Sequence, residues 1–256
     1  MQKLKLLTLN LHCLVEENLF LKQQTIAEKI AEYDMDIIFL QEVAQTQKNP
    51  IHSTTVKTDN YGLVLQQLLK NMNKIYYLYF EPIKQSFGKY DEGVAFLSKH
   101  PITYSQSKII SKTNDYNDWK MRKILVYYLP LETQKIYLAT THFGWSDGYE
   151  VFEEQVDQAL LVLPKQDFTI IAGDFNITPQ SKEYRYILEK GLLDVFQDDP
   201  IYFKKPTHKE HMDIHTTGTR IDYIMTNQKV ELLDKEILFI DQPVSDHFGV
   251  YIEIKL

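Results

Sequence analysis

Acidic, amide and imidazole side chains recur at the ends of short apolar runs in this sequence. The run at residues 170–172 leads into Asp174 and Asn176, and Asp246 and His247 come just before the run that begins at Gly249. Short apolar runs of this kind are typical of buried strands. Polar groups at the ends of such strands lie at the edge of a sheet, where a metal ion and a phosphate can be held away from bulk water.

The same arrangement occurs elsewhere in the chain. Asn10 and His12 follow the first apolar run, Glu42 follows the second, His142 follows a later one, and Asp222 lies within a short apolar run. A single acid beside a strand is usually a turn residue or a helix cap. Repetition of the pattern along one chain instead indicates one site to which several strands contribute.

These residue types match the needs of phosphate-ester hydrolysis. A hard divalent cation needs oxygen ligands, which Glu42, Asp246 and the Asn10 amide supply. An attacking water needs a base, and the Asp174 carboxylate suits that role. The charge that develops on the phosphate needs nearby donors. Three further side chains provide them: Asn176, His142 and His247.

The elements expected to position these residues are strands alternating with amphipathic helices. Helices are predicted at 20–33, 61–71, 149–163 and 182–190, and strands at 3–10, 37–41, 76–80, 93–98, 102–107, 123–129, 135–141, 168–172, 221–225, 230–240 and 250–254. About four helices and roughly ten strands, partly paired as hairpins, predict an α/β fold with two packed sheets flanked by helices.

The chain shows no Pro/Gly/Ser-rich linker, composition break or internal repeat, which predicts one domain over residues 1–256. Two polar stretches, 44–60 and 198–220, are predicted to be long loops. Loops of this length are usually functional. Because one follows Glu42 and the other precedes Asp222, we expect them to form walls of the site.

Composition narrows the partners. The chain has 256 residues, a net charge of −7 and one cysteine. Proteins that bind long nucleic acids usually have a basic surface. The negative net charge of this chain therefore favours a small phosphorylated substrate. No apolar run approaches the ~20 residues needed to cross a bilayer, so no membrane partner is expected. With no secretion segment and no possible intrachain disulfide, the cytoplasm is the expected location.

Seven short motifs, taken together, resemble the endonuclease/exonuclease/phosphatase superfamily. They occur in the family's order across nearly the whole chain: Leu-Asn-Leu-His, Gln-Glu-Val, Gly-Val-Ala-Phe-Leu-Ser, Thr-His-Phe, Gly-Asp-Phe-Asn, Arg-Ile-Asp-Tyr-Ile and Ser-Asp-His-Phe. One such motif alone is weak, but the ordered set is specific. The resemblance implies a four-layer α/β/β/α sandwich of the DNase I-like type, with its site at one edge of the paired sheets.

The resemblance also implies metal-binding roles. Glu42 matches the principal Mg²⁺-binding glutamate, Asn10 the asparagine beside it, and Asp246 a second, looser metal contact. Mn²⁺ is a possible substitute for Mg²⁺. His12 departs from the acid that some DNA-repair members carry, and a neutral imidazole is a poorer Mg²⁺ ligand than a carboxylate. A second tightly bound Mg²⁺ at His12 is therefore not expected.

Catalytic roles follow from the same resemblance. Asp174 matches the aspartate that orients or deprotonates the attacking water, and Asn176 the residue that holds the phosphate. His247 matches the site histidine, and Asp222 its carboxylate partner. His142 matches a position that contacts the phosphate in many members, and Arg122 lies near one that does so in some members.

Other polar residues have simpler interpretations. The histidines at 208, 211 and 215 have the spacing of metal ligands but lack the apolar framing of a zinc site. We expect a solvated loop there. Cys13 is interpreted as a small buried residue rather than a nucleophile.

The superfamily includes nucleases, deadenylases, sphingomyelinases and several phosphatases, so the fold does not decide the substrate. Trp145 and Trp119 are aromatic side chains with carboxylates nearby in the sequence. Such a combination is suited to binding hydroxylated rings. The two stretches at 141–145 and 115–122 resemble the maltose 6'-phosphate phosphatases of Gram-positive bacteria. The sequence thus predicts a Mg²⁺-dependent phosphomonoesterase that acts on a sugar phosphate by in-line attack of a water activated by Asp174.

Two alternatives remain open at this point. One is a DNA-repair-type endonuclease or exonuclease that acts on phosphodiesters. The net charge is unfavourable for it, and residues 44–60 offer only Lys48 and Lys57 as cations. The other is a degenerate member used only for binding, which the complete set of site residues argues against.

Overall fold

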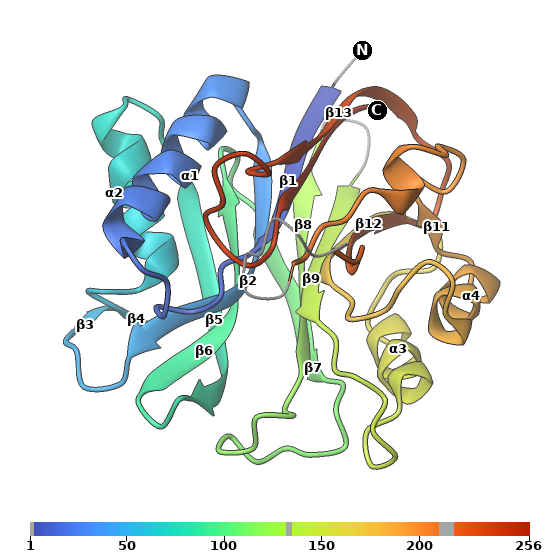
Figure 1. The fold of residues 1–256 in the computed structure, drawn as a ribbon, viewed down its shortest axis with the longest axis horizontal. Helices are drawn as coiled ribbons and strands as arrows, with labels where there is room; N and C mark the ends of the chain where they lie inside the picture. The colour runs from blue at the N-terminus through green and yellow to red at the C-terminus, as the bar shows by residue number, and fades with distance from the viewer. Residues whose placement is uncertain (1–2, 132–134, 210–217) are drawn as a thin grey trace.

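The computed structural model describes residues 3–131, 135–209 and 218–256. Two six-stranded sheets pack face to face, and helices cover their outer faces (Figure 1). This confirms the predicted four-layer α/β/β/α sandwich. No helix in the described part of the chain is long and apolar enough to cross a membrane.

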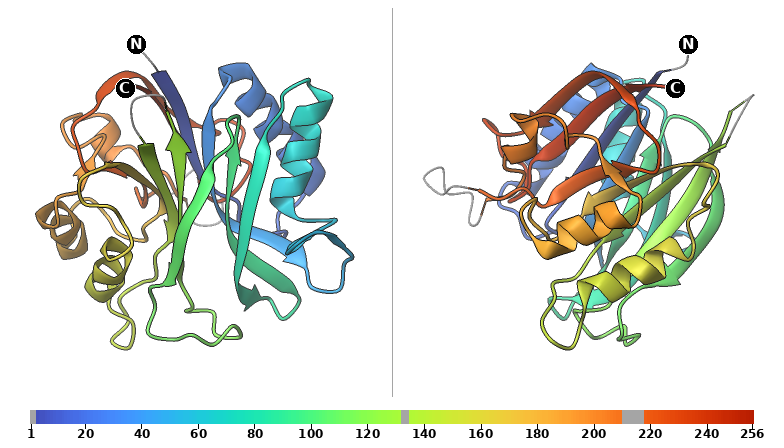
Figure 2. Two further views of the ribbon diagram at one scale, coloured as in Figure 1. Left: turned by 180° about the vertical axis from the view of Figure 1, so that it is seen from behind. Right: turned by 90° about the vertical axis from the view of Figure 1, so that its right-hand side faces the viewer.

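The first sheet has the order β13-β14-β1-β2-β6-β5. Its strands are β1 (Lys3–Asn10), β2 (Ile37–Thr46), β5 (Tyr77–Ser86), β6 (Tyr90–Ser98), β13 (Glu231–Leu238) and β14 (Gly249–Lys255). Strand β1 pairs in parallel with β2 and antiparallel with β14. The start of β1 and the end of β14 therefore lie side by side, with Lys3 paired with Lys255 (Figure 2).

The second sheet has the order β11-β12-β10-β9-β8-β7. Its strands are β7 (Thr103–Ile109), β8 (Lys123–Pro130), β9 (Lys135–His142), β10 (Phe168–Asp174), β11 (Leu193–Asp194) and β12 (Asp222–Thr226). Strand β10 is buried along its whole length because it lies inside the sheet and both its faces are covered.

Four α-helices form the outer layers. Helices α1 (Leu19–Tyr33) and α2 (Tyr61–Asn71) cover the first sheet, and α3 (Phe152–Leu160) and α4 (Lys182–Glu189) cover the second (Figure 1). Each helix buries an apolar face with helical spacing, as Ile26 and Ile30 do in α1. A large apolar cluster fills the space between the sheets, and two others lie under the helix pairs.

Parallel pairing aligns the polar strand ends. Asn10 is the register partner of Gln41 in β1 and β2, and Asp174 is the partner of His142 in β10 and β9. Parallel strands present their carboxyl ends at the same edge. The two sheets are also joined near this edge, where the Gln41 side chain accepts from Thr8 Oγ1 at 3.3 Å and donates to Thr140 Oγ1 at 3.1 Å.

The structure corrects the prediction for residues 44–60. Strand β2 continues to Thr46, and the hairpin of β3 (Ile51–Ser53) and β4 (Val56–Lys57) follows. The extension forms because β2 resumes its pairing with β6 after a bulge between Leu40 and Val43. The second predicted loop contains a short 3₁₀ helix, η1 (Tyr202–Lys204).

Helix α3 is shorter than the predicted span of 149–163. The Asp147 carboxylate accepts hydrogen bonds from the backbone nitrogens of Tyr149 and Glu150, at 3.1 and 2.8 Å. These bonds hold a turn where the apolar periodicity predicts helix, because a short acidic side chain competes for backbone amides.

Candidate active site

The bulge in β2 places Glu42 at the edge of the first sheet. Glu42 has a left-handed backbone with φ of 49°, which is uncommon for a residue with a Cβ. Bulges of this kind re-aim a side chain and are frequent beside active sites. Burial and the nearby Glu92 carboxylate raise the pKa of Glu42. Its negative charge is thus costly unless a cation lies beside it.

Asn10 joins the two sheets' acidic residues. Its Nδ2 donates to Glu42 Oε1 at 3.0 Å and to Asp174 Oδ2 at 3.1 Å. Its Oδ1 accepts from the backbone nitrogen of His12 at 3.0 Å. In this arrangement the amide nitrogen, rather than the oxygen expected to bind metal, faces the carboxylates, so Asn10 holds them in place.

Asp174 lies at the centre of the cluster and is almost fully buried. Burial raises its pKa to about 7, although the nearby His247 acts in the opposite direction. Its Oδ2 lies 3.5 Å from His142 Nε2 and 3.7 Å from His247 Nε2. A carboxyl group with a pKa near neutrality is suited to accept a proton from water.

The turn after β10 positions Asn176. The Asn176 backbone nitrogen donates to Asp174 Oδ1 at 2.9 Å, and its φ of 54° is one that asparagine tolerates well. Its Nδ2 donates to the Phe143 carbonyl at 2.8 Å and lies 3.0 Å from His142 Nε2. Asn176 and His142 thus occupy adjoining positions next to Asp174.

The two buried histidines differ in charge. Burial disfavours a cation at His247, but Asp222 and Asp174 outweigh it and raise the pKa of His247 to about 10. Burial lowers the pKa of His142 well below its usual value, and Arg122 and Lys84 add to this. At neutral pH the cluster therefore has one charged imidazole and one neutral imidazole.

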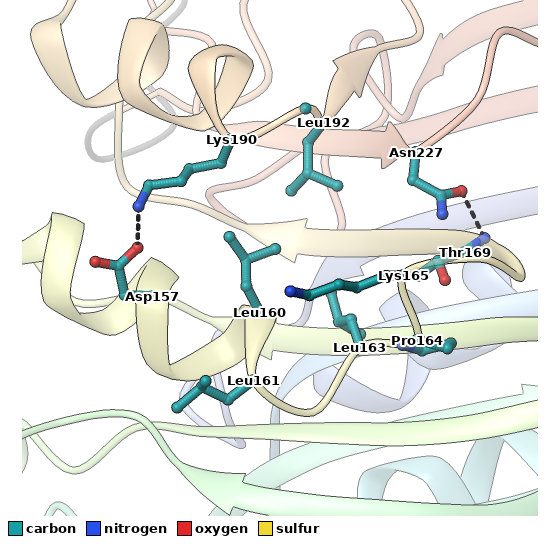
Figure 3. Close-up of a pocket in the computed structure, with 11 residues that line it drawn as sticks. Asp157, Leu160, Leu161, Leu163, Pro164, Lys165, Thr169, Lys190, Leu192 and Asn227 are labelled. Carbon is teal, nitrogen blue, oxygen red and sulfur yellow. Dashed lines mark hydrogen bonds and ion pairs between the residues drawn. The ribbon is translucent and has the colours of Figure 1, made fainter.

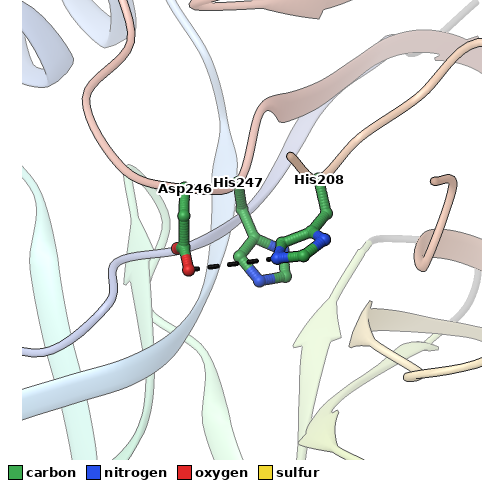
Figure 4. A group of neighbouring side chains, drawn as sticks. All are labelled: His208, Asp246 and His247. Atoms are coloured by element: carbon green, nitrogen blue, oxygen red, sulfur yellow. Dashed lines mark ion pairs between the residues drawn. The ribbon is translucent and has the colours of Figure 1, made fainter. Parts of the chain in front are cut away.

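Asp246 stands beside this cluster and contacts two histidines from other segments. Its Oδ1 lies 3.6 Å from His12 Nδ1, and its Oδ2 lies 4.0 Å from His208 Nε2 (Figure 4). The His208 and His247 rings pack at 4.7 Å between centroids. The Ser245 hydroxyl also donates to Asp246 Oδ1, at 3.1 Å, so a serine and two histidines surround this carboxylate.

The expectation of a solvated loop is wrong for His208. A backbone bridge pairs His208 with His247, and Thr207 Oγ1 accepts from the backbone nitrogens of Ile221 and Asp222, each at 3.0 Å. These contacts draw the segment into the site. The other two histidines of that predicted cluster, at 211 and 215, lie outside the described residues.

Arg122 and Lys84 extend the site on the side of His142. Both are buried, and both donate to the Trp119 carbonyl, at 2.6 Å from Arg122 Nη1 and 2.9 Å from Lys84 Nζ. Lys84 Nζ also pairs with Glu92 at 3.1 Å. The sequence analysis missed Lys84 and Glu92, although Glu92 directly precedes the apolar run at 93–98.

Trp119 and Trp145 lie at the rim and do not enter the acidic cluster. Their exposed fractions are 59% and 54%. Together with Gly144 and Arg122 they line a small hollow, whereas Arg122 and His142 line another. Arg122 therefore lies between the two tryptophans on one side and His142 of the acidic cluster on the other.

Cys13 is buried, as predicted. Burial raises the pKa of its thiol far above its usual value, and the nearby Glu92 and Glu42 carboxylates raise it further. Its Sγ lies 3.5 Å from Glu92 Oε2. A thiol held in this state is inert as a nucleophile.

A larger hollow lies elsewhere, between α3 and α4 on the outside of the second sheet (Figure 3). Its walls include Leu160, Leu163 and Leu192, and Lys190 pairs with Asp157 at its edge, at 2.6 Å. It contains none of the predicted site residues. Size alone would have selected the wrong location.

The donor set fits a divalent cation. Glu42 and Asp174 contact the same amide nitrogen, and burial raises the pKa of both. The Glu92 carboxylate adds to the effect at Glu42 and the Asp222 carboxylate to that at Asp174, and a hard cation with oxygen ligands relieves such repulsion. Glu42 is the more accessible of the two and so the better direct ligand.

The sandwich and its acidic cluster define a metal-dependent phosphoesterase. Residues 7–247 match the model of the Endonuclease/Exonuclease/phosphatase family. The chain belongs to this family, whose members are metal-dependent hydrolases that act on phosphate ester bonds. No curated protein has a sequence similar enough to match this chain.

Solved structures resemble the protein over its whole length. An endonuclease/exonuclease/phosphatase family protein from Leptotrichia buccalis is 28% identical with a TM-score of 0.90, covering 99% of this chain and 100% of that one. TDP2 of D. rerio, complexed with a single-strand DNA product, is 21% identical with a TM-score of 0.71 and full coverage of both chains. The human Nocturnin catalytic domain with bound sulfate is 17% identical with a TM-score of 0.69, covering 99% and 93%. At these identities the last two show a shared fold.

Proposed function

We propose that the protein is a Mg²⁺-dependent phosphomonoesterase whose substrate is a sugar phosphate such as maltose 6'-phosphate. The observation that carries this proposal is the position of Arg122, which lines both the hollow with His142 and the hollow with Trp119 and Trp145. If the phosphate group of the substrate lies beside His142, the sugar that it is bonded to would lie on the side of Arg122 where the two tryptophans are. Exposed indole faces suit a sugar ring.

In this proposal Glu42 binds Mg²⁺ directly, Asn10 orients Glu42, and Asp246 is a looser contact. Mn²⁺ is a possible substitute. A cation held there would supply charge neutralisation to a phosphate. Asn10 contacts both Glu42 and Asp174, so it would hold the metal ligand and the base next to each other.

Asp174 takes the proton of the attacking water. Its pKa of about 7 allows it to accept that proton near neutral pH. The Asn176 amide beside it holds a phosphate oxygen, and the neutral His142 donates a hydrogen bond to another. In an in-line attack the water oxygen bonds to phosphorus as the bond from phosphorus to the sugar oxygen breaks, and the leaving alkoxide takes a proton from solvent water.

His247 stabilises the developing negative charge. Asp222 Oδ2 lies 2.9 Å from its Nδ1, which keeps the imidazole protonated and directs Nε2 toward Asp174. A fixed positive charge in a buried site stabilises a transition state more strongly than it would in water. Asp222 therefore acts through His247, as a positioning residue.

Charge around the rim argues against the nuclease alternative. The stretch that carries Trp119 also carries Asp115 and Asp118, and the Lys120 ammonium is paired with Asp147 at 2.5 Å. A surface that tracks a nucleic-acid backbone needs unpaired basic groups. We further infer that residues 1–256 act as one catalytic domain, since both sheets contribute to the site, and that the protein works in the cytoplasm.

The test is a phosphate-release assay with Mg²⁺ on a panel of mono- and disaccharide phosphates, run beside abasic and plasmid DNA. We expect release from a disaccharide phosphate, its loss with EDTA, and intact DNA. The Asp174→Asn variant serves as the inactive control. Cleavage of DNA with no release from any sugar phosphate would overturn the proposal in favour of a nuclease. No turnover of any substrate would favour a binding protein.

A further inference from the structure

The small hollow beneath the tryptophans contains a buried donor without a protein partner. Arg122 is 4% exposed, and its Nε has no hydrogen-bond partner among the described residues. A Cβ built on Gly144 would lie 3.6 Å from this Nε and 3.1 Å from Gln155 Nε2, so Nε borders the space that a larger side chain at Gly144 would fill. The hollow is lined by both residues.

The acidic residues around the hollow are already engaged. Glu150 accepts from the backbone nitrogens of Lys112 and Thr113 and from the Gln155 amide. Asp147 accepts from two backbone nitrogens and pairs with Lys120. Among the buried side-chain atoms without a partner in the described residues, Arg122 Nε is the one that belongs to a residue lining this hollow, and it requires an acceptor such as a hydroxyl oxygen.

The size of the hollow restricts the group that enters it. Its volume is about 40 Å³. One water needs roughly 10–15 Å³ measured in this way, so the hollow takes a hydroxyl or hydroxymethyl group but not a whole ring. The ring that carries this group would lie outside, against the exposed faces of Trp119 and Trp145.

Lys120 holds together the two segments that form the hollow. Its ammonium pairs with Asp147 and lies 5.6 Å from the centroid of the Trp119 ring and 5.5 Å from that of Tyr149. Trp119 belongs to the segment before β8, whereas Asp147 and Tyr149 belong to the segment after β9. The ion pair and the two cation–π contacts therefore set the width between the walls.

We propose that this hollow is a subsite for one hydroxyl or hydroxymethyl group of a neutral sugar ring, with Arg122 Nε as its donor and Lys120 as the residue that sets its width. The inference deepens the proposed function and rests on it for the place of the phosphate, on the other side of Arg122. It assigns Lys120 and Gly144 as specificity-determining residues for the alcohol portion of the substrate.

The two tryptophans of the chain both line this hollow, so intrinsic tryptophan fluorescence reports on it alone. The experiment is a fluorescence titration of the full chain, without metal or phosphate, using neutral mono- and disaccharides that include maltose. Sorbitol, which has no ring, is the control. We expect a saturable change with at least one sugar and none with sorbitol.

Two variants should raise the dissociation constant of that sugar at least tenfold. Gly144→Ala places a methyl group between Arg122 Nε, at 3.6 Å, and Gln155 Nε2, at 3.1 Å, and Lys120→Met removes the ion pair with Asp147. Lys29→Met is the matched control, because Lys29 pairs with Glu32 at 2.7 Å and lies 5.3 Å from the Tyr33 ring centroid, on α1. It should bind the sugar as the unaltered chain does.

The absence of a saturable change with every sugar would overturn the inference, as would equal affinity in the Gly144→Ala and Lys120→Met variants. Because the titration uses no phosphate, its failure is distinct from failure of the proposed function. Hydrolysis of a sugar phosphate without binding of any neutral sugar would contradict the subsite and leave the proposed function intact. Sugar binding without any hydrolysis would remove the phosphatase assignment and leave the subsite.

Discussion

The carboxylate of Asp222 and the imidazole of His247 form a buried pair, with Oδ2 lying 2.9 Å from Nδ1. The other oxygen of Asp222 is buried and has no hydrogen-bond partner among the described residues. His247 is therefore the side-chain partner of the Asp222 carboxylate, and this carboxylate favours the protonated form of the imidazole.

Replacing Asp222 with Asn should lower the pKa of His247 from about 10 toward its usual range near 6.5. The neutral amide removes the largest attraction that favours the imidazolium, while the attraction of Asp174 and the burial that disfavours the charge remain. NMR titration of the histidine ring protons measures this pKa. Asp36→Asn is the control, since Asp36 lies 3.8 Å from the exposed His100. An unchanged His247 pKa would show that Asp222 does not hold the charge.

The same pair predicts how stability changes with pH. The folded-state pKa of His247 is raised, so protonation favours folding. The contribution is fully present below pH ~6.5, the unfolded value, and is lost as pH rises to about 10. Urea unfolding of the unaltered chain and of His247→Gln, at pH 6 and pH 9.5, should show a difference that shrinks at the higher pH. A difference that grows would contradict this sign.

Asp174→Asn should lower kcat by roughly 10²–10⁴-fold, the range for loss of a general base. The amide keeps the acceptor for the Asn176 backbone but cannot take a proton. Steady-state phosphate release measures kcat, and circular dichroism checks the fold. Near-normal turnover would exclude Asp174 as the group that activates water.

Glu42→Gln should stabilise the metal-free protein and abolish stabilisation by Mg²⁺. Burial and Glu92 raise the pKa of Glu42, so its charge opposes folding at neutral pH, and a neutral amide relieves this cost. Thermal unfolding with EDTA and with excess Mg²⁺ separates the two effects. Glu154→Gln, at an exposed ion pair with Lys112, is the control. A Mg²⁺-dependent rise in Tm that persists in Glu42→Gln would place the cation elsewhere.

Asp194→Asn should lower the free energy of unfolding by about 3–5 kcal/mol, because it leaves the buried Arg220 guanidinium without its counter-charge. Both Nη atoms of Arg220 lie 2.7 Å from the Asp194 carboxylate. Urea unfolding measures the loss. Asp198→Asn, at the exposed pair with Lys229, should change stability by no more than ~1 kcal/mol. Equal effects at both pairs would mean that burial of the Arg220 pair is unimportant.

The layers and most of the acidic cluster were predictable because local patterns determine them. Asp174 and His142 end parallel neighbouring strands and are register partners, so strand-end reasoning brings them together. Glu42 follows the same logic, although the bulge that aims it was not predicted. Every strand and helix predicted from period-two or helical apolar spacing has the predicted type, whereas the short strands β3, β4 and β11 were not predicted.

The missed residues depend on contacts between distant segments. Lys84 lies past the predicted end of its strand, and only the fold shows that it shares the Trp119 carbonyl with Arg122. His208 reaches the site through a backbone bridge to His247, almost forty residues away. Polar residues in irregular segments carry no periodic pattern, so their positions follow from long-range pairing alone.

The pairing of β1 with β14 has a consequence for synthesis of the protein. Strand β1 stays without its β14 neighbour until residues 249–255 have been synthesised. Asp246 and His247 directly precede β14, so His247 reaches Asp174 only when that strand forms. A nascent chain that has not yet reached β14 therefore lacks a complete acidic and histidine cluster, and hydrolysis waits for this strand to join the sheet.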